Sequence, residues 1–169
     1  MSILNESKYG YDTKGNVIRL SLLRSPAWPD PHADEGVHHF TYAIYPHKGS
    51  WEVSGTGRRG YELNYPLLVR VEPNHSGELP AAQSLLAIDS PTVFLTAMKK
   101  AEDDNSLILR FYKLAGGVEE TTITLPCAAT EAVETDLIER PFSRLQVAAN
   151  RVRVQMKPYE IKTVKVKFE

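Results

Sequence analysis

The chain has one cysteine and almost no net charge, and both shortages limit what it can be. Its 169 residues include 20 Lys and Arg against 21 Asp and Glu, which gives a formal net charge of −1. A lone Cys127 excludes an internal disulfide and a thiolate zinc cage, and it fits a reducing compartment. A chain without excess positive charge has no field that attracts nucleic acid or an anionic membrane. We therefore expect a cytoplasmic protein without nucleic-acid partners.

Long apolar runs and targeting signals are absent as well. No uninterrupted apolar stretch approaches the roughly 20 residues that cross a bilayer. The first ten residues, MSILNESKYG, contain no basic stretch followed by an apolar one, so the sequence as given predicts no secretory signal. We expect no membrane partner.

The common catalytic motifs are missing too. Neither GxSxG nor HExxH occurs, and the glycine-rich residues 55–60, GTGRRG, lack the Lys-Ser/Thr of a phosphate loop. We interpret residues 55–60 as a structural turn and Cys127 as a buried small thiol. Pairs of carboxylates suited to a hydrolase arise by chance in any chain with this many acids. These absences argue against catalysis by the chain alone.

The densest candidate for a metal site is the segment 29–39, PDPHADEGVHH. Imidazole and carboxylate side chains together suit zinc or manganese. The spacing is not that of a helical zinc motif, and Pro29-Asp30-Pro31 is typical of a stiff turn in which Asp makes local hydrogen bonds. We therefore favour a hydrogen-bonded connection between two strands over a metal site. Its potential ligands are Asp30, His32, Asp34, Glu35, His38 and His39.

Aromatic residues leave a second alternative open. Trp28, Trp51 and several tyrosines could stack on sugar rings in a shallow groove, but aromatic side chains are also ordinary core residues. A sugar-binding module therefore remains an alternative hypothesis to an enzyme domain.

Alternating apolar residues predict antiparallel β-structure along almost the whole chain. In the first part we expect strands at 16–24, 39–45 and 67–71, and a short helix within 50–64 that ends before Pro66. The polar, turn-rich residues 72–80, EPNHSGELP, mark a boundary. The first two strands should each bury one face, formed by Ile18, Leu20 and Leu22, and by Phe40, Tyr42 and Ile44.

Beyond the boundary, apolar runs recur at the spacing of a β-sandwich, roughly 8–12 residues. Ala115-Gly116-Gly117 predicts a hairpin turn between two of them. In the last run Ile161 is out of phase, which indicates a bulge near Thr163 or one strand with two partners. Its lysines, Lys162, Lys165 and Lys167, suit a solvent face or a protected edge. The runs lie at 85–88, 93–98, 106–114, 118–125, 132–137, 145–147, 151–156 and 161–168.

The first 70 residues contain a series of ordered blocks: LNESKYGYD at 4–12, RLSLLRSP at 19–26, PDP at 29–31, FTY at 40–42, and YELN at 61–64 followed by Pro66-Leu67. These blocks resemble the C-terminal β-region of the glycoside hydrolase family 38 α-mannosidases, closest to the bacterial and cytosolic branch. The C-terminal 100 residues resemble the terminal β-domain of that family mainly in pattern.

The resemblance implies an all-β fold in two parts. Residues 1–72 would be the tail of a larger, galactose-mutarotase-like sandwich, and residues 73–169 a small immunoglobulin-like sandwich. In that family the zinc ion, the nucleophilic Asp and the acid/base carboxylate belong to an N-terminal barrel, which this chain does not contain. We therefore expect no cofactor and no catalytic or metal-binding residue here. The parent chain would hydrolyse α-mannosides with retention, using zinc in its catalytic domain.

The resemblance also suggests roles and partners. The chain would pack on the catalytic barrel and help to wall the groove for the α-mannoside glycan. The residues expected to contact that groove are Asn5, Lys8, Tyr9 and Arg24. Strands without their original neighbours should drive the isolated chain into a homo-oligomer. The alternative is a free-standing carbohydrate- or protein-binding β-module.

Overall fold

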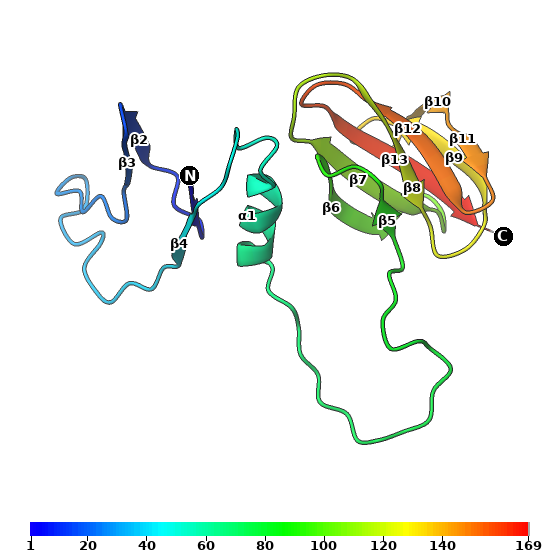
Figure 1. Cartoon of the computed structure of the whole chain (residues 1–169), viewed down its shortest axis with the longest axis horizontal. Coiled ribbons are helices and arrows are strands. Elements are labelled where there is room, and N and C mark those ends of the chain that lie inside the picture. Colours follow the sequence, from blue (N-terminus) through cyan, green and yellow to red (C-terminus); the bar gives the residue numbers. More distant parts are fainter. Residues whose placement is uncertain (169) are drawn as a thin grey trace. The chain divides into compact units, whose positions relative to one another are not determined.

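The computed structural model describes residues 1–168 and divides the chain into two compact units, Met1–Arg70 and Val71–Glu169 (Figure 1). We call the first the N-terminal unit. Residues 66–86 contain no helix or strand, and all regular structure of the second unit lies in residues 87–168. Among the described residues, the single helix has nine residues and cannot cross a bilayer.

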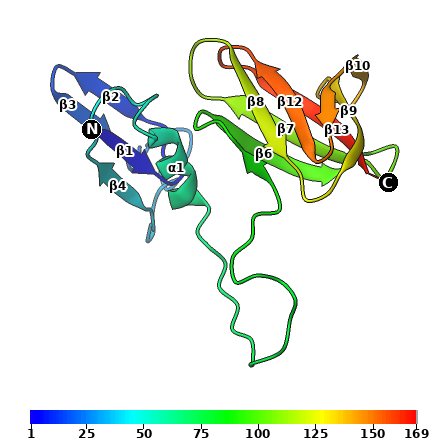
Figure 2. The same ribbon diagram turned by 45° about the vertical axis from the view of Figure 1, so that its right-hand side comes forward.

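The N-terminal unit consists of four short strands and one helix. They are β1 (Ser2–Asn5), β2 (Tyr11–Lys14), β3 (Val17–Leu20), β4 (Tyr42–Tyr45) and α1 (Thr56–Asn64). β1 pairs with β4 and β2 pairs with β3, both antiparallel, as Figure 2 shows. The unit is therefore built from two separate two-stranded sheets and a helix that packs on β1.

Two glycines shape the hairpin of β2 and β3. Gly15 has φ +59° in the two-residue turn between Lys14 and Val17, a conformation that favours glycine. A Cβ on Gly10 would lie 2.9 Å from the Cβ of Ser21. The amide of Ser21 donates to the Gly10 carbonyl oxygen at 2.8 Å, so the chain runs close to itself just beyond the hairpin.

The predicted short helix is confirmed as α1. It ends at Asn64, before Pro66, and begins at Thr56 after Gly55, which has φ +74°. Residues 56–60 were expected to be part of a turn and instead form the first turns of this helix. The interpretation of residues 55–60 as a turn alone was therefore wrong. Pro66 limits only where a helix can end, and α1 starts ten residues earlier, within the glycine-rich segment.

None of the first 70 residues, all of which are described, is buried. The predicted alternation holds on β3, where Ile18 and Leu20 are half-buried and Val17 and Arg19 are exposed. On β4 the phase is opposite to the prediction, since Tyr42 and Ile44 are exposed.

The cause of the reversed phase is what covers β4. The hydroxyl of Tyr45 donates to the carbonyl oxygen of Ser54 at 2.9 Å, so the segment before α1 lies over the face that carries Ala43 and Tyr45. Nothing among the described residues buries the opposite face of this strand.

The prediction of a strand at 67–71 was wrong. Leu67, Leu68, Val69 and Val71 are between 88% and 99% exposed, and the ribbon runs extended without a pairing neighbour (Figure 1). A strand needs a hydrogen-bonded partner as well as apolar residues. Within the described residues no segment supplies that partner.

Residues 87–168 form two antiparallel sheets, which we call the terminal sandwich. One sheet has the order β10-β9-β13-β7-β6 and the other has the order β11-β12-β8-β5. Every predicted run in this half overlaps a strand, and β10 is the one strand of this half that the pattern did not predict. The strands are β5 (Ala87–Ile88), β6 (Val93–Lys100), β7 (Leu107–Lys113), β8 (Glu119–Thr124), β9 (Ala129–Thr135), β10 (Pro141–Arg144), β11 (Gln146–Ala148), β12 (Arg151–Met156) and β13 (Ile161–Phe168).

The hydrophobic core lies between these two sheets. On β12 the buried and exposed residues alternate perfectly, with Val152, Val154 and Met156 inside. Each fully buried side chain of this kind stabilises the fold by roughly 1.5–3 kcal/mol. The all-β sandwich prediction is confirmed. The core residues are Val93, Leu109, Phe111, Ile123, Leu125, Ala132, Val152, Val154, Met156, Val164 and Val166.

Residues 115–117 are a connection between sheets and not the predicted hairpin turn. β7 and β8, which they join, belong to different sheets. The buried Lys113 explains the path, because its Nζ donates to the carbonyl oxygens of Ala115 at 3.0 Å and Gly116 at 3.1 Å. Its Nζ is also 3.4 Å from a carboxylate oxygen of Glu119 at the start of β8. The glycines close the end of the sandwich around this ammonium.

β13 is one continuous strand with two partners, β7 and β9. Its register shift lies between Lys167 and Phe168, so no bulge occurs near Thr163. The expectation of a protected edge was wrong, because β13 is the central strand of its sheet. Lys162 is buried, with its Nζ 2.5 Å from Glu134 and 3.5 Å from Glu160.

The core predicts a clear contrast between two phenylalanines. Phe111 is 0% exposed, whereas Phe142 on β10 is 64% exposed. Phe111→Ala should lower the free energy of unfolding by about 3–5 kcal/mol. Phe142→Ala should change it by less than about 0.5 kcal/mol. Urea unfolding followed by circular dichroism measures both, and equal losses would contradict the assignment of the core.

Candidate functional site

The loop at residues 5–10, which we call the 5–10 loop, is held by contacts of Asn5 at the end of β1. The side-chain oxygen of Asn5 accepts the backbone N–H of Lys8 at 2.5 Å, and its amide nitrogen donates to the hydroxyl of Tyr11. The side chain of Asn64, at the end of α1, donates to the Asn5 carbonyl oxygen at 3.1 Å. Residues far apart in the sequence thus anchor the base of this loop.

The other predicted groove residues occupy three different settings. The ammonium of Lys8 lies 5.1 Å from the centre of the Phe40 ring, within cation–π range. Tyr9, on the same loop, is 90% exposed. Arg24 is exposed in the connection between β3 and β4. The structure therefore brings Asn5, Lys8 and Tyr9 together on one loop and places Arg24 on another segment.

Three partners of this loop were not among the predicted site residues: Tyr11, Phe40 and Asn64. Asn64 is 59 positions from Asn5, and no periodicity in the sequence indicates that contact. Only the order of the blocks that contain these residues pointed to a shared region. The role of the 5–10 loop toward a glycan stays a prediction.

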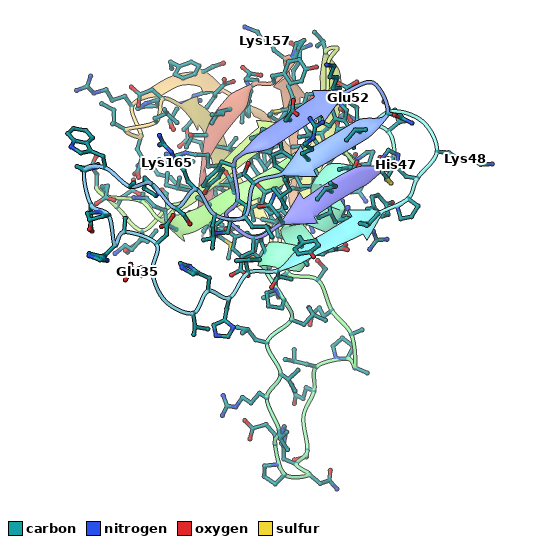
Figure 3. The ribbon with its side chains drawn as sticks, turned by 90° about the vertical axis from the view of Figure 1, so that its left-hand side faces the viewer. Glu35, His47, Lys48, Glu52, Lys157 and Lys165 are labelled. Carbon is teal, nitrogen blue, oxygen red and sulfur yellow. The ribbon has the colours of Figure 1, made fainter. Side chains whose placement is uncertain are left out.

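Residues 29–39 form a hydrogen-bonded connection between β3 and β4. The Asp30 carboxylate accepts the backbone N–H of His32 at 2.9 Å, and the His32 ring nitrogen lies 2.7 Å from Glu35, which Figure 3 labels. Asp34 accepts the backbone N–H of Ser25 at 2.6 Å, and its carbonyl oxygen lies 2.9 Å from the ring of His38. The polar atoms of these side chains thus hydrogen-bond to one another or to the backbone.

The chemistry of that connection does not fit a metal ion. Within residues 1–168, no group of three His, Cys, Asp or Glu side chains is arranged to hold one. His32 and Glu35 satisfy each other, and Asp34 is committed to the backbone of Ser25.

Two other sequence expectations concern single side chains. Cys127 was expected to be buried and is exposed, because it falls in the surface turn between β8 and β9. Trp28 and Trp51 are both exposed, so neither serves as a core residue. The alternative of sugar stacking therefore stays open for them.

A further candidate surface, on the N-terminal unit, is apolar. Ile3 and Ile44 are paired directly across β1 and β4, and side chains opposite each other in an antiparallel pair share a face. Together with residues of β3 and β4 they line a depression of about 230 Å³. The lining residues are Ile3, Leu20, Leu22, Tyr42 and Ile44, which we call the apolar face.

Comparison with protein families gives matches in both units. The model of the glycosyl hydrolases family 38 C-terminal beta sandwich domain matches residues 92–164. The model of the glycosyl hydrolases family 38 C-terminal domain matches residues 1–32. The first match covers most of the terminal sandwich, and the second covers β1, β2, β3 and the 5–10 loop.

Three curated proteins are similar over nearly the whole chain. Alpha-mannosidase 2C1 from Homo sapiens is 38% identical over 95% of this chain. Alpha-mannosidase G from Dictyostelium discoideum is 34% identical over 96% of it, and Alpha-mannosidase from Saccharomyces cerevisiae is 30% identical over 99%. The chain spans 16%, 15% and 17% of the lengths of these three relatives.

Both units thus match the same family in sequence, and the antiparallel sandwich of residues 87–168 is the fold that the family description names. The identity of 30–38% holds over 95–99% of the chain, so the matches include residues of both units. The resemblance inferred from the sequence blocks is confirmed. The chain belongs to the C-terminal β-region of the glycoside hydrolase family 38 α-mannosidases.

Proposed function

We propose that this chain is the accessory, non-catalytic C-terminal β-region of an enzyme that hydrolyses α-mannosides with retention. It packs on the catalytic barrel and helps to wall the groove that holds the glycan. Support comes from the relatives, each named an alpha-mannosidase, and from the short share of their length that the chain spans. The barrel supplies zinc and the reacting carboxylates.

The observation that carries this proposal is the apolar face of a unit without a core. The N-terminal unit buries none of its residues, yet Ile3, Leu20 and Ile44 share one depression. Covering apolar surface stabilises a protein by roughly 25 cal/mol per Å². A unit this poor in buried residues gains the stability that it lacks by placing that face against the barrel region.

The 5–10 loop and Arg24 form the glycan-facing part of the proposal. Asn5 fixes the base of the loop through Lys8 and Tyr11, which leaves the Tyr9 ring exposed for a sugar. The Lys8 ammonium and the Arg24 guanidinium add hydrogen-bond donors for sugar oxygens. We assign these four residues to groove contact and none of them to catalysis.

A free-standing carbohydrate- or protein-binding β-module is the second candidate. The exposed Trp28, on the connection between β3 and β4, favours it because an open indole face suits a sugar ring. The gene upstream of Ser2 separates the two. An in-frame zinc-binding barrel supports the accessory region, and a stop codon before a separate start supports the module. For either candidate we propose the cytoplasm, on the strength of the single, exposed Cys127.

The accessory role predicts that the purified 169-residue chain releases no aryl alcohol from an aryl α-mannoside, with or without added zinc. The reason is that the carboxylates of residues 29–39 are held by hydrogen bonds within the chain. A colorimetric assay measures this. Zinc-dependent turnover that survives repurification and disappears in His32→Ala or His38→Ala would refute the proposal.

The apolar face predicts that the isolated chain self-associates. Light scattering at about 100 µM, well above the micromolar dissociation constant of a modest interface, should show a dimer or a larger species. Ile44→Glu should restore the monomer because it places a charge on the apolar face, where Ile44 is 65% exposed. Val37→Glu, at an 87% exposed site outside that face, is the matched control and should stay associated. A strictly monomeric wild-type chain would show that the N-terminal unit needs no partner.

A further inference from the structure

The outer face of the five-stranded sheet carries a groove of about 380 Å³ beside its edge strand β10. Its floor comes from β9 and β13, which pair antiparallel with Lys167 opposite Glu131. Its rim comes from β10 and from the turn that follows β6. The side chains that matter here are Asp104, Glu131, Phe142, Arg144, Lys165 and Lys167, and we call this site the β10 groove.

Cations and carboxylates are already paired in the β10 groove. The ammonium of Lys165, which Figure 3 labels, lies 2.9 Å from Asp104. Glu131 accepts from two sides, with Arg144 at 3.5 Å and Lys167 at 3.8 Å. Three cations against two carboxylates leave one net positive charge. The groove therefore offers donors and acceptors side by side without a strong field of either sign.

The Asp104 carboxylate remains a hydrogen-bond acceptor at neutral pH. Hydrogen bonds from Ser106, followed by the Lys165 ammonium, hold the pKa of Asp104 well below its usual range. The long separations around Glu131 leave its oxygens able to accept further hydrogen bonds, because charge-assisted bonds prefer about 2.7–2.9 Å. A ligand hydroxyl can enter between these partners.

Phe142 adds an aromatic surface at the rim. The register of β10 on β9 shifts between Pro141 and Ser143, which makes Phe142 the extra residue of a bulge. A bulge re-aims a side chain, and bulges are frequent next to binding sites. Phe142 stays 64% exposed beside the paired charges.

We propose that the β10 groove binds a neutral sugar, with its hydroxyls between the paired charges and its C–H face on the Phe142 ring. A sugar hydroxyl both donates and accepts, which matches a lysine beside a carboxylate. A phosphate would meet Asp104 and Glu131 as like charges, and an apolar ligand would desolvate the ion pairs. The volume falls within the range of small-ligand sites, roughly 300–1,000 Å³.

This site lies entirely within the terminal sandwich and does not depend on the accessory role proposed above. NMR titration of the full chain tests it, with methyl α-D-mannopyranoside, methyl α-D-glucopyranoside and methyl β-D-galactopyranoside as probes. At least one should shift the amides of β10, β9 and β13 with a millimolar dissociation constant. Glu131→Gln should weaken that binding about tenfold, as expected for one hydrogen bond to a charged group.

Variants of the aromatic ring separate stacking from general packing. Phe142→Ala should weaken binding about fivefold, and Phe142→Tyr, which keeps the ring, should retain it. Glu120→Gln is the matched control for Glu131→Gln, since Glu120 pairs with Arg153 on the other sheet, and it should bind like the wild type. The amides of Val152 and Val164 report in each variant that the core is intact.

Three results would overturn the proposal. The first is no shift in the β10 groove with any of the three glycosides. The second is inorganic phosphate that shifts the same amides at lower concentration than every sugar, which would make this an anion site. The third is a set of sugar-induced shifts confined to the 5–10 loop. That result would support the accessory role and exclude a sugar site in the β10 groove.

Discussion

Burial of apolar side chains between its two sheets is the interaction on which the terminal sandwich depends. Valines of β12 and β13 meet Leu109, Phe111 and Ile123 from the neighbouring strands and reach almost complete burial. Two buried lysines lie next to that core. Lys113 and Lys162 are buried at its margins because backbone carbonyls and carboxylates of adjoining segments surround their ammonium groups.

The N-terminal unit lacks such a core, and its properties follow from that lack. Its strands are short, its two sheets are separate, and its apolar face and the residues 67–71 stay exposed. Local hydrogen bonds from Asn5 and Asn64 nevertheless give the 5–10 loop a defined base. The accessory role proposed above would account for the exposed apolar face, because that face would then pack on the catalytic barrel.

Sequence patterns predicted β3, β4 and most strands of the terminal sandwich. They missed the short strands β1, β2 and β10, and they failed where partners or coverings are set by distant residues. Alternation located β12 and β13 because both faces of each strand meet a defined environment in the sandwich. The same reasoning assigned Tyr42 and Ile44 to a buried face, which the contact of Tyr45 with Ser54 reverses. It also made a strand of residues 67–71, where apolar composition is present and a neighbour is not.

The candidate sites were less accessible to such reasoning. Asn5, Lys8, Tyr9 and Arg24 came from resemblance, and the partners Tyr11 and Phe40 become evident only in the folded chain. The β10 groove left no periodic signal, because β10 is short and its bulge at Phe142 interrupts the alternation. The charged residues that alternate on β9 and β13 are typical of a solvent-exposed face, and only the folded chain shows that β10 borders them to form a groove.

Amide hydrogen exchange of the isolated chain at low micromolar concentration tests the central claim, that only the terminal sandwich carries its own core. Amides of β7, β12 and β13 should exchange only through global opening, and those of β1, β2, β3 and β4 should exchange at rates close to an unstructured chain. Comparable protection in the two units at this dilution would contradict the account, because the N-terminal unit would then hold together without a partner.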